Sequence, residues 1–464
     1  MLRIRYNIAQ YRFYIVLLFL LAFLIVRYTK ILFALGFPEF EVVTGISTNP
    51  WLSILIIVAF FIIGLVLVKK GLSLFEKFKK YQYYYYIPVF VVVLAIFIFG
   101  AFRLADSTDE LRDVAIFNIV NEHTLNAYLT DEYLTQNGNQ NQGQLRWAQY
   151  LHPPLQYMLA HWFTDGQQSV PVYRLLFIGI FLVIGTIAIF SFKKLGLHSS
   201  VLLLACSLIL TYSYFRNYQI IRVGNEMSPF ITFNGLCLIL GFYYIGKIKI
   251  NFLWWVLMIV LMALTIWFKF SFIVALLGLL GSFVISFLIK KDIKILKAGG
   301  ILLMVSLLGM LLYVWAYHDS YMGQEQAKYY THLFTSKIPF LPTTALDLNQ
   351  YQTGSSSSVP KYIYSFIFWY GPVIPLFVSV YFLGVIKKQI KFNTLHLIVV
   401  IWLLIAIFGT LLVNPRATYT APFTIAFLFL CITSIKNYFK AEEIPALASL
   451  LILFGCTEVL LLSV

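Results

Sequence analysis

Long apolar runs separated by short polar segments recur along the whole chain. Many reach about 17 to 25 residues, the length that a helix needs to cross roughly 30 Å of hydrocarbon. The pattern predicts an all-α, polytopic membrane protein with about thirteen transmembrane helices. They lie near residues 13–35, 51–68, 85–102, 172–192, 199–215, 229–246, 252–267, 271–289, 298–316, 363–386, 395–413, 419–435 and 444–463.

Two basic residues interrupt the first of these apolar runs. Arg27 and Lys30 both fall inside the predicted span 13–35. A charged side chain within hydrocarbon is costly, and long basic side chains near a helix end reach toward the interface. We therefore expect this helix to end early and both side chains to extend toward water.

The composition agrees with a membrane protein. Of the 464 residues, 61% are apolar and only 11% charged, with a mean hydropathy of +0.84. A soluble protein of this size would carry far more surface charge. Cys206, Cys237, Cys431 and Cys456 all fall in apolar runs without metal-type spacing, so we interpret them as small core residues.

The net charge of +15 is distributed in a way that argues against nucleic acid as a partner. Lys and Arg concentrate in alternate short loops, as in residues 69–80, 290–297 and 387–391. The positive-inside rule then predicts a cytoplasmic N-terminus, an outer C-terminus and contact with membrane lipids. Since no Asn-X-Ser/Thr acceptor occurs in a loop, we favour a bacterial inner membrane.

Two long loops, residues 103–171 and 317–362, lie on the predicted outer face, whereas every inner loop is short. Functional residues often lie on such loops. Within the first loop, Leu155, Met158, Leu159 and Trp162 recur at helical spacing, with Gln156 and His161 off that stripe. We expect a helix that follows His152-Pro-Pro and lies in the membrane interface.

The same loop contains ADSTDELRDVAIFNIVNEH, residues 105–123. Val114, Ile116, Phe117 and Val120 predict a second interfacial helix, capped by Ser107 or Thr108. Asp109 and Glu110 then stand in its first turn. Such acids often only complement the helix dipole.

Further charged residues stand at the outer hydrocarbon edge, and we expect them to share one pocket with the acid pair. They are Arg222, Glu226, Lys269 and Arg416, with Tyr419 nearby. Taken singly, each resembles an interface anchor or an ion-pair partner. Together, the cations suit a lipid phosphate, a carboxylate can act as general base, and a divalent metal could bridge acid and phosphate.

The order of these motifs resembles the GT-C superfamily of integral-membrane glycosyltransferases, in the branch of protein O-mannosyltransferases and the lipid A aminoarabinose transferase. The similar segments are TDEL (108–111), HPPLQY (152–157), YRLL (173–176), KFSF (269–272) and RATYTAPF (416–423). The resemblance covers residues 85–435. It implies one transmembrane domain over 1–464, with two extra helices in 1–84 and a last helix in 436–464.

The resemblance implies an inverting transferase with a polyprenyl-phosphate or dolichyl-phosphate sugar donor, working on the extracytoplasmic face. Asp109 would be the general base, and Glu110 would position it or a metal. His152 would orient the acid pair or the surface helix, and Lys269, Arg416 and Tyr419 would hold the phosphate. Arg222 and Glu226 are assigned to the substrate site from their position at the outer edge rather than from the resemblance, because the family often has Asp where this chain has Glu226. Glu110 and Glu226 are the candidate ligands for Mg or Mn.

The acceptor could be a glycan, a lipid or a protein, and other functions stay open. A transporter or flippase of a lipid-linked glycan should show internal repeats and broken helices. An O-antigen-type polymerase or ligase would also have a long outer loop, but its chemistry should depend more on Arg and His. A purely structural membrane protein is the remaining alternative.

Overall fold

The computed structural model describes residues 2–28, 50–78, 82–104, 108–123, 155–194, 199–211, 251–268, 272–317, 371–413 and 423–463. This part of the chain is helical, without strands. The helices are α1 (Leu2–Tyr28), α3 (Pro50–Phe78), α4 (Gln82–Arg103), α5 (Thr108–His123), α9 (Leu155–Phe163), α10 (Val170–Lys194), α11 (Ser199–Thr211), α13 (Phe252–Phe268), α14 (Phe272–Lys290), α15 (Ile293–Tyr317), α18 (Val373–Ile386), α19 (Thr394–Val413), α20 (Thr424–Tyr438) and α21 (Ile444–Leu462).

Every predicted span except 229–246, which lies outside the described residues, overlaps a helix over the residues of that span that the structure describes. Several helices extend beyond the apolar run that predicted them. α3 continues to Phe78, and α15 begins at Ile293, so basic segments expected as loops are partly helical. Lys and Arg are good helix formers, and their charged ends can reach water while the backbone stays helical.

Four helices among the described residues are long and apolar enough to cross a membrane. The apolar stretches are Tyr11–Tyr28, Trp51–Lys69, Ile293–Trp315 and Ile444–Leu462. Large apolar side chains are exposed along such helices, for example Ile62 on α3 and Leu311 on α15. Extended apolar exposure of this kind suits contact with lipid rather than water. The full count of thirteen spans stays a prediction.

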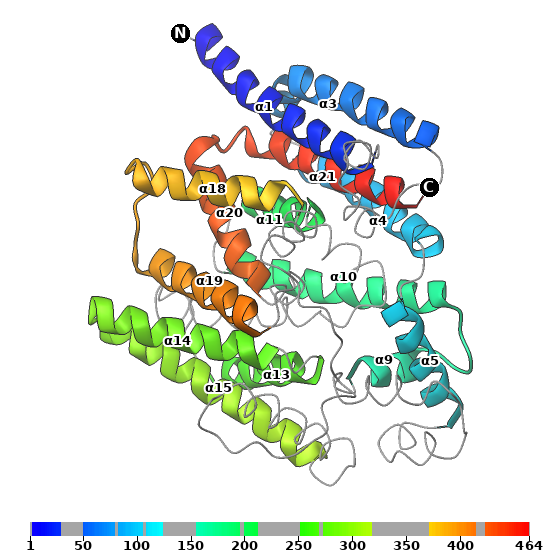
Figure 1. Cartoon of the computed structure of the whole chain (residues 1–464), viewed down its shortest axis with the longest axis vertical. Coiled ribbons are helices and arrows are strands. Elements are labelled where there is room, and N and C mark those ends of the chain that lie inside the picture. Colours follow the sequence, from blue (N-terminus) through cyan, green and yellow to red (C-terminus); the bar gives the residue numbers. More distant parts are fainter. Residues whose placement is uncertain are drawn as a thin grey trace.

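The helix α21 is the most enclosed of these four. Of its membrane-length stretch, 83% is buried, against 28% for the stretch in α3. It packs against α1, α3, α4 and α11, so the last helix of the chain joins the first ones (Figure 1). α14 packs on α15 and α19, and α18 packs on α20.

The two ends of the helix bundle differ. Figure 1 shows the start of α1 and the turns α14–α15, α18–α19 and α20–α21 along one edge, while α5 and α9 lie toward the opposite edge. Lys291 and Lys388 are exposed in two of these turns. The described basic turns thus share one end of the molecule, as alternation of charge predicts. That this end is cytoplasmic stays a prediction.

Arg27 does not extend toward water as expected. Its side chain is 7% exposed, and Nη1 donates to Oε1 of Glu458 on α21 at 3.0 Å. The Tyr28 hydroxyl donates to the same oxygen at 3.2 Å. The expectation was wrong because the Glu458 carboxylate, on a helix distant in sequence, binds the guanidinium inside the bundle. Arg27 therefore does not have to reach water for a partner. Lys30 lies outside the described residues.

The contact of α21 with α11 depends on a glycine. A Cβ atom at Gly455 would stand 2.7 Å from the backbone oxygen of Leu210, closer than carbon and oxygen can pack. Gly309 on α15 allows a similar approach to Ala263 on α13, at 2.8 Å from its backbone nitrogen. Small residues let helix backbones approach closely within a membrane.

Candidate functional site

The two helices predicted in the first long loop are both present. α5 begins at Thr108, and α9 begins at Leu155, directly after the two prolines of the HPPL motif. Of the apolar residues predicted to pack, Val114, Ile116 and Phe117 are buried. α5 contacts α9 and α10, so the loop packs on the start of the helix that follows it.

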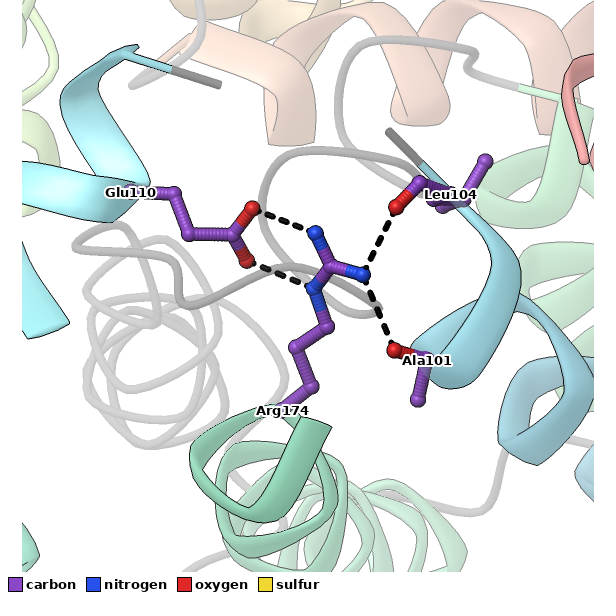
Figure 2. Close-up of polar contacts among 4 residues, drawn as sticks. All are labelled: Ala101, Leu104, Glu110 and Arg174. Carbon is purple, nitrogen blue, oxygen red and sulfur yellow. Dashed lines mark hydrogen bonds and ion pairs between the residues drawn. The ribbon is translucent and has the colours of Figure 1, made fainter. Parts of the chain in front are cut away.

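An ion pair between Glu110 and Arg174 joins α5 to α10 (Figure 2). Arg174 Nε donates to Glu110 Oε1 at 2.7 Å, and Nη2 donates to Oε2 at 2.6 Å. The two residues are 1% and 2% exposed, respectively. A bidentate pair of this kind is short, strong and fixed in orientation.

The same guanidinium also binds the last turn of α4. Its Nη1 donates to the backbone oxygens of Ala101 and Leu104, both at 2.9 Å (Figure 2). The last carbonyls of a helix have no partner within it, and a cation there also meets the favourable end of the helix dipole. Arg174, near the start of α10, therefore connects this helix to the end of α4 and to the first turn of α5.

A second buried carboxylate lies on the same side of α5. Asp113 is 1% exposed, and its Oδ1 accepts a hydrogen bond from the Tyr157 hydroxyl of α9 at 3.3 Å. The ring of Phe117 lies 5.3 Å from that of Tyr157, 4.8 Å from that of Tyr173 and 5.8 Å from that of Phe177. Phe117 thus packs against three aromatic rings, one of which belongs to the tyrosine that binds Asp113.

Asn118 holds the turn between α9 and α10. Its Oδ1 accepts from the backbone nitrogen of Gln168 at 2.9 Å and from the Tyr173 hydroxyl at 2.7 Å. Its Nδ2 donates to the backbone oxygen of Gln168 at 3.3 Å. Gly166 in this turn has a φ of 61°, which glycine adopts without strain. We call Glu110, Asp113, Asn118, Tyr157, Tyr173 and Arg174 the first-loop polar cluster.

The predicted apolar stripe of α9 has two kinds of surroundings. Leu155 is buried against protein, whereas Trp162 is 59% exposed, which suits a side chain that meets lipid. Gln156, predicted to lie off the stripe, is fully buried. The buried residues are Leu155, Gln156, Tyr157 and Ala160. The helix turns this face toward protein rather than lipid, because α5 offers polar partners that a bilayer lacks.

Glu110 makes an ion pair, and a metal ligand role would compete with it. Both carboxylate oxygens accept hydrogen bonds from Arg174, so a cation would have to displace the guanidinium. Among the residues that the structure describes, no three His, Cys, Asp or Glu side chains come together to hold a metal ion. Glu226, the other predicted ligand, lies outside them, and metal use stays a prediction.

The structure places only part of the predicted site. Glu110 is described in full, and Asp109 is described only as a backbone position in the first turn of α5. The other predicted site residues lie outside the described residues; they are His152, Arg222, Glu226, Lys269, Arg416 and Tyr419. Their convergence into one pocket stays a prediction.

The sequence pattern did not assign a role to Arg174, although this residue stands in the YRLL segment. A signal for it existed, because a charged residue within an apolar run needs a partner. Glu110 is a suitable acid in the preceding loop. Sequence alone does not say which acid, since 64 positions separate the pair.

Comparison of the chain with protein-family models, with curated proteins and with solved structures yields no match.

Proposed function

We propose that the protein is a glycosyltransferase that moves a sugar from a polyprenyl-phosphate donor to an acceptor on the extracytoplasmic face. The observation that carries the proposal is the Arg174–Glu110 pair, which joins the helix beginning at TDEL to the end of α4 and to the start of α10. A reacting carboxylate needs such a rigid support. The order of the motifs in the sequence supplies the class of reaction.

In the proposed reaction, an oxygen of the acceptor hydroxyl attacks C1 of the donor sugar as the bond from C1 to the phosphate oxygen breaks. The hydroxyl proton passes to Asp109, and the electron pair leaves with the polyprenyl phosphate. A single displacement inverts the configuration at C1. Lys269, Arg416 and Tyr419 would stabilise the charge that develops on the phosphate.

The geometry of the first-loop polar cluster is compatible with different roles for Glu110 and Asp109. Glu110 is buried, and Arg174 neutralises its charge, so its role in the proposal is to position the first turn of α5. Neighbouring residues of a helix are rotated by about 100° from each other. Position 109 therefore lies on a different side of α5 from the ion pair, which is compatible with a separate role in proton transfer.

A transporter is the second candidate, because Arg27 and Glu458 form an ion pair within two apolar helices. Charged groups inside transmembrane helices often mark transport pathways. The two candidates differ in their product, since a transporter moves a lipid-linked sugar without breaking its glycosidic bond. An assay of sugar transfer in membranes therefore separates them.

The test uses mass spectrometry of lipids and glycans from a deletion strain. We expect the intact polyprenyl-phosphate sugar to accumulate and one modified glycan, lipid or protein to disappear. The wild-type gene should restore the product, whereas Asp109→Asn, at equal membrane abundance, should lower transfer by on the order of 10²-fold or more. Asp165→Asn is the matched control, as it alters an exposed acid in the turn after α9. Normal transfer by Asp109→Asn would refute the mechanism.

A further inference from the structure

Asp113 is a buried acid that the proposed reaction does not use. It lies three residues after Glu110 on α5, and this spacing places the two acids on neighbouring parts of one helix face. At 1% exposure, its carboxylate has lost almost all contact with solvent. A buried carboxylate is costly in free energy unless polar groups bind it. Asp113 therefore needs a hydrogen-bond partner inside the protein.

The partner in α9 is equally enclosed. Tyr157 is 0% exposed, and its hydroxyl reaches Asp113 Oδ1 at 3.3 Å. Its ring is tilted by 58° against that of Phe117, at a distance of 5.3 Å. The hydrogen bond and the ring contact attach Tyr157 of α9 to two residues of α5, so neither rotation nor sliding of α9 along α5 leaves both contacts intact.

This contact joins the two segments that carry the predicted motifs. Asp113 stands one helical turn after Asp109, about 6 Å along the axis of α5. Tyr157 is the third residue of α9 and belongs to the HPPLQY motif. A shift of about 1 Å would break a hydrogen bond that is already 3.3 Å long. The spacing between the acid helix and α9 therefore depends on this pair.

We propose that Asp113 and Tyr157 are positioning residues whose hydrogen bond sets the spacing of α5 and α9 in the transferase site. The inference rests on the proposed function for its effect on turnover. Asp113 acts through its oxygen as a hydrogen-bond acceptor, without taking up the proton of the reaction. Asparagine offers the same acceptor without the charge, whereas leucine offers none.

One set of variants tests the role through turnover. The probe is the polyprenyl-phosphate sugar isolated from the deletion strain, supplied to membranes of that strain that contain each full-length variant. Tyr157→Phe and Asp113→Leu should each lower kcat by on the order of 10²-fold with an unchanged KM for the lipid. Asp113→Asn should keep at least half of the wild-type kcat and its pH profile. Tyr11→Phe, on the exposed side of α1, is the matched control.

A second readout does not depend on activity. Spin labels at positions 111 on α5 and 162 on α9, both exposed, report the distance between the helices in a cysteine-free variant. We expect a narrow distribution for the parent protein and for Asp113→Asn. Tyr157→Phe should broaden or shift it.

Each outcome decides the proposal. An unchanged distance distribution with Tyr157→Phe would overturn it, as would an Asp113→Asn variant as inactive as Asp109→Asn, because the carboxylate would then take part in chemistry. If no variant or parent transfers sugar but Tyr157→Phe still broadens the distribution, the proposed function fails, and the spacing role of the pair stands.

Discussion

Two buried Arg–Glu pairs join helices in the described part of the chain, and their surroundings differ. Arg174 and Glu110 join α5 to α10, with further hydrogen bonds to the backbone of α4. Arg27 and Glu458 join α1 to α21, and the Arg27 guanidinium lies 5.8 Å from the ring of Phe23 and 5.3 Å from that of Tyr28. The first pair is surrounded by polar backbone, and the second by aromatic rings.

Because their surroundings differ, we expect the two ion pairs to contribute differently to the unfolding free energy. Desolvation of two charges can cost as much as their attraction returns, so a buried pair is weak evidence of stabilisation by itself. Arg174 additionally satisfies helix carbonyls that would otherwise lack a partner. We therefore expect the Arg174 pair to be irreplaceable by apolar residues, and the Arg27 pair to be replaceable.

The largest effect is expected from Arg174→Ala. It leaves the Glu110 carboxylate buried without its cation and removes the donors to Ala101 and Leu104. We expect a loss of about 3–5 kcal/mol in unfolding free energy, measured by denaturation of the full-length protein in detergent micelles. Arg103→Ala, an exposed arginine at the end of α4, is the control and should cost little. Equal losses for both variants would contradict the role of the pair.

A double replacement compares the two pairs directly. Arg27→Leu with Glu458→Leu should leave the unfolding free energy within about 1–2 kcal/mol of wild type, because apolar groups can replace a buried ion pair. Arg174→Leu with Glu110→Leu should still cost several times more, since the carbonyls of α4 lose their donors. The same denaturation assay measures both. Similar losses of unfolding free energy for the two double variants would show that the two ion pairs do not differ in whether apolar residues can replace them.

A smaller effect is expected from Asn118→Ala in the first-loop polar cluster. This change removes the oxygen that accepts hydrogen bonds from the backbone N–H of Gln168 and from the Tyr173 hydroxyl. We expect a loss of about 1–2 kcal/mol in unfolding free energy and faster hydrogen exchange at the backbone N–H of Gln168. Asn437→Ala, at an exposed position of α20, is the control. An unchanged exchange rate would show that this hydrogen bond does not hold the turn.

The smallest effect is expected from Tyr28→Phe. The hydroxyl that donates to Glu458 is lost, while Arg27 still binds the same carboxylate oxygen. We expect a loss of about 0.5–1.5 kcal/mol by thermal unfolding in micelles. A loss as large as that of Arg27→Ala would mean that the tyrosine, rather than the arginine, is the main support of the buried carboxylate.

The positions of α5 and α9 were predictable, but their contacts were not. Proline and apolar periodicity place the start of α9, and the residues after TDEL predict α5. The buried side of α9 depends on what it packs against. α5 accepts Tyr157 through Asp113, and Trp162 stays exposed. The remaining predicted site residues lie outside the described part of the chain, so their geometry stays a prediction.

The sequence by itself determined which segments are helical and apolar enough for a membrane, because helix length and side-chain periodicity are local properties. The tertiary structure decided which charges meet. Hydrogen bonds act over about 3 Å, and no local pattern states that Arg174 finds Glu110 or that Arg27 finds Glu458. Those pairings follow from the packing of helices that are distant in the chain.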